Sequence, residues 1–188
     1  MRVFIAIDID EEIKKALSDL QQQLQNKAGT RTGDVTWVRA DNMHLTLKFL
    51  GEVADNRIAK VCDTVKDVAD GHSKFELDIE EVGCFGGKSA RVIWVGTGQG
   101  ADSLCRLQAE IDKRLASGGW PKEKRKFTGH LTLARIRRPQ AGVILGQMAE
   151  DYKELKLGTV SVDSVYVYQS ELTQQGPVYT RLGSYKLQ

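Results

Sequence analysis

Apolar residues alternate along this chain between short continuous runs and helical spacing. Residues 3–7 are all apolar, the pattern of a strand that is covered on both faces. Apolar residues then recur at helical spacing from Ile13 to Leu24, behind an acidic segment at 10–12 that suits the start of a helix. The pattern therefore predicts a mixed α/β (α+β) fold that opens with a strand and a helix.

The same reading predicts the remaining elements. A helix is expected over about 55–69 from an N-cap at Asp55, another over 104–115 ended by Gly118 and Gly119, and a weaker one over roughly 143–155. Strands are expected at 35–38, 43–50, 75–80, 92–95, 127–136, 160–168 and 178–187. Gly176 and Pro177 are expected in the turn between the last two strands.

One tetrapeptide, His-Leu-Thr-Leu, occurs twice, at 44–47 and 130–133, and contains two of the three histidines in the chain. Each copy follows a strand, a helix and a loop, and these two units begin near Arg2 and Arg91. We interpret residues 1–188 as a single bilobal domain that arose by internal duplication. Two sheet-and-helix lobes, related by an approximate twofold axis, are expected to bring both motifs to a shared central cleft.

The motif places an imidazole and a hydroxyl on the same face of each predicted strand. Because successive side chains of a strand point to opposite faces, His44 shares a face with Thr46, and His130 with Thr132. The leucines between them belong to the opposite, buried face, and the same alternation predicts that Phe49 is buried. Each motif thus anchors two polar groups toward the cleft.

These residue types favour acid–base chemistry over the alternatives. A nucleophilic triad needs a serine or cysteine with a supporting carboxylate, and neither recurs with the motif. A metal site usually takes three or four ligands, so we expect no metal. Two imidazoles can hold one neutral and one protonated form near neutral pH, which suits displacement at phosphorus with one proton acceptor and one proton donor.

Two cations lie close to the motifs and could balance the charge of a phosphate. Lys48 is expected on the face of His44, and Arg135 carries the planar fork that suits phosphate. Strict alternation, however, places Arg135 on the opposite face from His130, so a β-bulge or a similar distortion would be needed. The alternative for both side chains is an ordinary solvated charge.

Composition limits the other possibilities. Hydrophobic residues make up 41% and charged residues 28% of the chain, as in soluble globular proteins, and the net charge of +2 gives no global attraction to nucleic acid. Polyanion binding would need a local patch, such as the basic residues of 122–126 or Arg137 and Arg138, although a solvated loop explains these equally well. The odd number of cysteines, three, and the lack of a long apolar run or a leader-like start predict a cytoplasmic protein without disulfides or membrane spans.

Aromatic residues offer candidates for stacking on a base. Trp37, Phe85 and Trp120 are open candidates, whereas Trp94 lies in an apolar run and is expected to be buried.

The residues around both motifs resemble the two-histidine phosphoesterases, and within them the RNA 2′,3′-cyclic phosphodiesterases, also called 2′-5′ RNA ligases. The resemblance covers nearly the whole chain and is carried by residues 2–8, 37–38, 44–51, 127–135, 170–172, 176–179 and Leu182. The doubled His-x-Thr-x motif is its specific part. Gly129 departs from the family, which commonly has proline before the second histidine, and we expect only a small effect on strand entry.

The resemblance implies a bilobal fold, no metal or organic cofactor, and hydrolysis of RNA 2′,3′-cyclic phosphate ends to 2′-phosphomonoesters, with reversible 2′-5′ ligation as a related reaction. It implies that His44 is the proton donor to the leaving 3′ oxygen and His130 the proton acceptor that activates water. It also implies that Thr46, Thr132 and Arg135 hold the phosphate. The residues themselves leave open which histidine is the acid.

The partner expected on this basis is RNA or a nucleotide with a 2′,3′-cyclic phosphate, bound by a monomer. Two alternatives remain at this stage. One is a phosphodiesterase of the same superfamily that acts on 2′-5′ oligonucleotides or another cyclic phosphoester. The other is a non-catalytic module that binds nucleotides or RNA.

Overall fold

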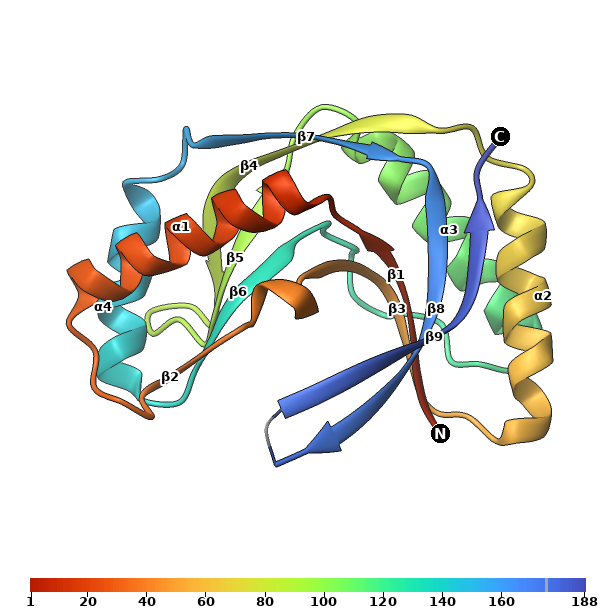
Figure 1. Ribbon diagram of the computed structural model, residues 1–188, viewed down its shortest axis with the longest axis horizontal. Helices are drawn as coiled ribbons and strands as arrows, with labels where there is room; N and C mark the ends of the chain where they lie inside the picture. Colours follow the sequence, from red (N-terminus) through yellow and green to blue (C-terminus); the bar gives the residue numbers. More distant parts are fainter. Residues whose placement is uncertain (175) are drawn as a thin grey trace.

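Two curled antiparallel sheets form the centre of the computed structural model, which describes residues 1–174 and 176–188 (Figure 1). In chain order the elements are β1 (Arg2–Asp8), α1 (Glu11–Ala28), β2 (Val35–Trp37), η1 (Ala40–Asn42), β3 (His44–Glu52), η2 (Asp55–Arg57), α2 (Ile58–Ala69), β4 (Phe75–Phe85), β5 (Val92–Thr97), α3 (Ala101–Ser117), β6 (Leu131–Ile136), α4 (Pro139–Glu150), β7 (Lys156–Val162), β8 (Ser164–Thr173) and β9 (Gly176–Lys186). The predicted mixed α/β, two-lobed architecture is confirmed.

The two sheets repeat one strand order. The first sheet runs β3-β1-β8-β9, and the second runs β6-β5-β4-β7 with β2 added at its edge. In both, the strand of the His-Leu-Thr-Leu motif pairs with the strand that opens its predicted unit, β1 or β5. This matching order supports the internal duplication, which stays a prediction.

The lobes do not coincide with the two halves of the sequence. β4 joins the second sheet, whereas β8 and β9 complete the first. The helices are exchanged in the same way, because α1 packs with α4 and β7, and α3 packs with α2 and β3 (Figure 1). Each lobe therefore contains elements from both predicted units, and neither unit forms a lobe by itself.

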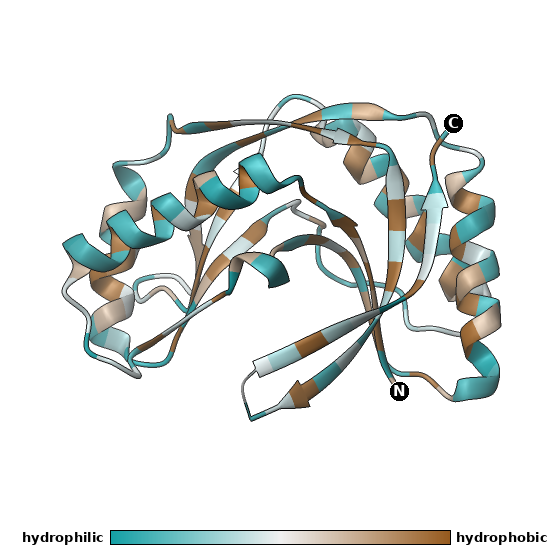
Figure 2. Ribbon diagram, in the orientation of Figure 1, coloured by the Kyte–Doolittle hydropathy of each residue, from teal (hydrophilic) through white to brown (hydrophobic). Residues whose placement is uncertain are grey.

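The first helix shows how the sequence specifies these elements. The Asp10 side chain accepts a hydrogen bond from the Ile13 N–H at 2.8 Å, and Gly29 ends α1 in the left-handed conformation. The apolar stripe that includes Leu17 and Leu24 is almost completely buried. Each such side chain contributes about 1.5–3 kcal/mol by leaving water, so the stripe holds α1 against the second lobe. Figure 2 shows the same stripes of apolar residues along the helices and the inner strands.

Several predicted boundaries were wrong. The last helix begins at Pro139, in the first-turn position that proline favours, and ends at Glu150 instead of continuing to 155. The strand expected at 160–168 is two strands, β7 and β8, that separate at Asp163. β6 begins at Leu131, so the segment 127–130 is not part of it, and Gly176 and Pro177 belong to β9.

The β8–β9 hairpin extends beyond the first sheet. Its register shifts between Val167 and Tyr168, and the outer part of the hairpin projects below the first sheet toward the side of the second sheet (Figure 1). None of the helices in the described part of the chain is long and apolar enough to cross a membrane.

Candidate active site

A β-bulge in β6 decides where Arg135 lies. Between Thr132 and Ala134 this strand advances two residues while β5 advances one, so Leu133 is an inserted residue. Leu133 and Ala134 are both buried, which shifts the alternation by one position. Arg135 consequently returns to the face of Thr132 and is exposed there. Strict alternation had placed Arg135 on the face opposite to His130, and the bulge is the distortion that brings it back.

β3 contains the equivalent bulge. It advances from Thr46 to Lys48 while β1 advances one residue, and both Leu47 and Lys48 are buried. Two expectations were therefore wrong, because Lys48 turns away from the face of His44 and Phe49 turns onto it. Phe49 is 62% exposed and lies at the position in β3 that Arg135 occupies in β6.

Lys48 instead forms a buried ion pair. Its Nζ lies 2.5 Å from Oδ1 of Asp112 in α3 and donates to the carbonyl oxygen of Pro121 at 2.8 Å. The same Asp112 oxygen accepts from the backbone N–H of Glu123 at 3.0 Å. This cluster ties β3 to α3 and to the loop that leads to His130, so the role of Lys48 is structural.

His44, the first residue of β3, lies among aromatic rings of the first lobe. The Phe4 ring stacks on it with 4.7 Å between centroids, and Tyr179 of β9 meets it edge-on at 5.2 Å. Burial lowers the pKa of His44 to about 4, against the opposing effects of the Asp8 charge and a hydrogen bond with the backbone of Asn42. The imidazole is therefore neutral at pH 7 in the free protein.

His130, directly before β6, has a matching but more open environment. Its Nδ1 lies 2.7 Å from the carbonyl oxygen of Thr128, two residues earlier, just as His44 bonds to the backbone two residues before it. A carbonyl partner at Nδ1 fixes the proton there and leaves Nε2 for proton transfer. The Phe85 ring meets His130 edge-on at 5.0 Å and Trp94 lies 6.2 Å away.

The aromatic residues that were candidates for stacking on a base differ in their exposure. Phe85 is 39% exposed beside His130 and remains available. Trp94 is half-buried, so the expectation of burial holds only in part, and Trp37 packs against the core. Trp120 is 6% exposed and lies under the guanidinium of Arg57, which excludes it as a stacking surface.

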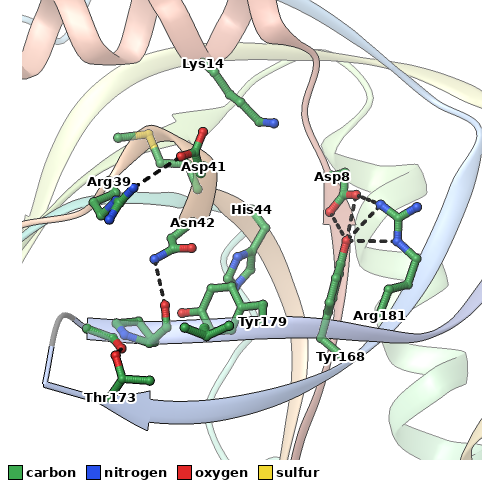
Figure 3. Close-up of a pocket in the computed structure, with 14 residues that line it drawn as sticks. Asp8, Lys14, Arg39, Asp41, Asn42, His44, Tyr168, Thr173, Tyr179 and Arg181 are labelled. Atoms are coloured by element: carbon green, nitrogen blue, oxygen red, sulfur yellow. Dashed lines mark hydrogen bonds and ion pairs between the residues drawn. The ribbon is translucent and has the colours of Figure 1, made fainter.

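An acidic and aromatic network beside His44 was missed by the sequence analysis. Asp8 pairs with His44 across β1 and β3, and its carboxylate accepts hydrogen bonds from the Tyr168 hydroxyl at 2.7 and 2.8 Å and from Arg181 at 2.8 Å (Figure 3). Burial, followed by the bond to Asp8, raises the pKa of Tyr168 to about 12. Asp8 ends the segment 2–8 that carries the resemblance, but nothing in the sequence joins it to Tyr168 and Arg181, because they meet only when β8 and β9 join β1.

A cavity of about 540 Å³ opens beside this network. Asp8, His44, Tyr168 and Arg181 line it with the start of β9, whereas His130 does not, so it lies on the side of the first lobe (Figure 3). The two lobes meet close by, because β3 and β6 are in contact. Within the second lobe, Gln21 of α1 donates to the carbonyl oxygens of Val38 and Leu133, both at 2.8 Å, and so holds α1 against the edge of that sheet.

The charge of Arg135, in the second sheet, acts on Tyr179 in the first sheet. Burial raises the pKa of Tyr179, and the positive charge of Arg135 opposes that rise, so Arg135 acts on the phenol that contacts His44. The site thus combines His44, Tyr179 and Arg135 from different sheets. Among the described residues, no cluster of three or more histidine, cysteine, aspartate or glutamate side chains could hold a metal ion.

Comparison with known proteins decides the family. A model of the LigT-like phosphoesterases matches the chain twice, over 7–94 and 95–179. The chain belongs to the LigT-like phosphoesterase family. Its resemblance to the two-histidine phosphoesterases is therefore confirmed, and each match contains one copy of the motif.

Relatives of the same family cover the chain almost completely. An RNA 2′,3′-cyclic phosphodiesterase of Thermotoga maritima is 35% identical over 181 residues, which is 95% of this chain and 91% of that protein. One from Methanothermobacter thermautotrophicus is 29% identical over 188 residues, covering 100% and 99%. Among solved structures, the protein TT0787 of Thermus thermophilus has a TM-score of 0.81 at 25% identity and covers 100% of this chain and 98% of its own.

Proposed function

We propose that this protein hydrolyses RNA ends that carry a 2′,3′-cyclic phosphate to 2′-phosphomonoesters. The observation that carries the proposal is the paired site, in which two His-x-Thr segments on two sheets are each followed by a bulge. The LigT-like relatives from Thermotoga and Methanothermobacter, which are named RNA 2′,3′-cyclic phosphodiesterases, support the choice of substrate. One chain supplies both histidines, so a monomer is sufficient for the reaction.

The proposed reaction is an in-line displacement at phosphorus. His130 accepts a proton from water through Nε2 as the water oxygen bonds to phosphorus, and the bond from phosphorus to the 3′ oxygen breaks. His44 gives a proton to that leaving oxygen, so the 2′ phosphate remains on the ribose. Thr46, Thr132 and Arg135 donate hydrogen bonds to the non-bridging oxygens as negative charge develops on them.

The low pKa of His44 bears on this assignment. Burial favours the neutral imidazole, which by itself suits a base better than an acid. A phosphate anion bound beside His44 favours the protonated form, and the Asp8 carboxylate acts in the same direction. We therefore propose that His44 acquires its proton as the anionic substrate binds.

The assignment of acid and base can be tested with a changed leaving group. A cyclic substrate with sulfur in place of the 3′ oxygen needs no proton on its leaving atom. We expect this substrate to restore most of the rate lost in His44→Ala and none of that lost in His130→Ala. Rescue of His130→Ala instead would reverse the two roles.

The activity itself is tested on an oligonucleotide with a 2′,3′-cyclic end, in EDTA. General acid–base catalysis is worth roughly 10²–10⁴-fold per group, so His44→Ala and His130→Ala should each lose a factor of that order. His72→Ala is the matched control, since this third histidine bonds to the backbone of Val68 on α2. Full turnover in both variants would sink the proposal. Measuring turnover of 2′-5′-linked oligonucleotides beside the cyclic-ended one tests the alternative substrate. Adding an RNA with a 5′-hydroxyl end, which can take the place of water as the nucleophile, tests ligation.

A further inference from the structure

A second cavity, of about 380 Å³, lies at the end of β6 that is remote from His130. It is lined by the β4–β5 turn around Ser89, by Arg91, Arg137 and Arg138, and by the start of α4 at Pro139. In Figure 1 this is the end of β6 where the β4–β5 turn and the first turn of α4 come together. Nothing in the proposed reaction at the two histidines uses this cavity.

The backbone that forms the cavity is tightly packed. The Ser89 hydroxyl donates to the carbonyl oxygen of Pro139 at 2.9 Å. A Cβ atom on Gly142 would lie only 2.3 Å from the carbonyl oxygen of Ala90, so the turn and α4 approach as closely as glycine allows. The cavity is therefore a preformed feature of the second lobe.

Its charge is strongly unbalanced. Three arginine residues line it, and among the described residues their one ion pair joins Nε of Arg138 to Oδ1 of Asp34 at 3.9 Å. Within the described residues, Arg91 and Arg137 have no carboxylate within ion-pair distance, and the Arg138 side chain is 74% exposed. No side chain caps α4 and no acid lies in its first turn, so the positive end of the helix dipole adds to the excess. The cavity therefore suits an anion, and arginine favours phosphate.

The distance of the cavity from the active site indicates which phosphate of a substrate could bind in it. Thr132 and Arg135 lie on β6 and Arg137 directly follows it, and the five residue steps from Thr132 to Arg137, one of which is taken up by the bulge, span roughly 13 Å at the usual rise of a strand. One phosphate cannot reach both ends of that distance, and a mononucleotide has no second phosphate to offer. A single RNA strand carries a phosphate at every nucleotide and can reach the active site and the cavity together.

We propose that this cavity binds a backbone phosphate of the RNA strand whose cyclic end lies at His44 and His130. The enzyme then favours oligonucleotides over cyclic mononucleotides and needs a minimum strand length of a few nucleotides. This inference rests on the proposed function, since it extends the substrate of that same site.

The test compares Arg137→Ala/Arg138→Ala with wild type on a 2′,3′-cyclic mononucleotide and on cyclic-ended oligonucleotides of increasing length. Wild-type kcat/KM should rise with length and then level off, while the variant keeps the mononucleotide value and loses the rise. We expect a loss of roughly tenfold or more, as for one charge-assisted hydrogen bond. The salt dependence on long substrates should also weaken, by about 0.7 in the log–log slope per lost phosphate contact.

Two further variants make the result specific. Arg106→Ala/Lys113→Ala removes the same amount of positive charge from the exposed face of α3 and should leave kcat/KM unchanged on every substrate. Arg137→Lys/Arg138→Lys keeps the charge without the fork and should retain part of the length effect. Equal losses on the mononucleotide and the oligonucleotides, or no loss at any length, would overturn the inference.

Failure of the proposed function is recognised separately. If wild type turns over neither substrate, binding of an unreactive oligonucleotide with a 3′ hydroxyl, followed by fluorescence anisotropy, still tests the cavity. Weaker binding by Arg137→Ala/Arg138→Ala than by the α3 control supports the inference, and equal binding overturns it.

Discussion

The buried ion pair between Lys48 and Asp112 leads to a prediction about stability. Asp112→Ala removes the carboxylate and leaves the ammonium group of Lys48, whose side chain is 5% exposed, with only the carbonyl oxygen of Pro121 among the described acceptors. The change also removes the acceptor of the Glu123 N–H. The loop before His130 thereby loses one of its attachments to α3.

The magnitude follows from this geometry. Removing one partner of a buried pair costs about 3–5 kcal/mol, because the remaining charge stays unpaired away from water. The lost backbone bond adds about 1 kcal/mol, so we expect the free energy of unfolding to fall by about 4–6 kcal/mol. That is a large share of the roughly 5–15 kcal/mol typical of a folded domain.

The paired replacement Lys48→Met/Asp112→Leu separates charge from packing. It removes both charges while keeping similar volume, and its stability should lie within about 2 kcal/mol of wild type. The double-mutant cycle then gives a coupling energy of several kcal/mol between the two positions, outside the error of additivity for independent sites.

Urea unfolding followed by circular dichroism measures these differences, provided that the m-value is unchanged. Glu110→Ala on the same helix is the control, since it removes an exposed ion pair with Arg114 and should leave the midpoint where it is. A loss below about 1 kcal/mol for Asp112→Ala, or a double variant as unstable as the single one, would refute the reasoning.

Three further predictions concern the site. Arg135→Ala should lower kcat/KM roughly 10²–10³-fold with no change in the unfolding midpoint, as for a lost donor to a developing oxyanion, whereas a solvated charge would give little change. Because the pKa of His44 is about 4 when folded and about 6.5 when unfolded, the unfolded state binds more protons between these values. The free energy of unfolding should then fall as the pH drops through that window, by about 3 kcal/mol in full, and urea midpoints at pH 7 and pH 5 should differ less in His44→Gln. Gly129→Pro should destabilise the fold by about 1–3 kcal/mol, because a Cβ there would lie 2.5 Å from Leu104, and an unchanged melting temperature would contradict it.

The local parts of the fold could be predicted because they depend on neighbours in the sequence. The first helix follows from its cap at Asp10 and its apolar stripe, and His44 shares a face with Thr46 because side chains on a strand alternate. The doubled motif was sufficient to recognise the family, since residues at fixed short spacing carry that signal. These features needed no knowledge of what packs against them.

The rest depends on contacts between distant segments. The bulges at Leu47 and Leu133 appear only when each strand is aligned with its partner. They decide that Arg135 shares the face of Thr132, and that Phe49, not Lys48, shares the face of His44. The ion pair of Lys48 spans 64 residues, and Arg181 reaches Asp8 across 173. By itself the sequence therefore determined the two His-x-Thr pairs, but not the network of Asp8, Tyr168 and Arg181 beside His44. Only the tertiary structure decided which way they point and what holds them, because register and long-range packing override a strict period of two.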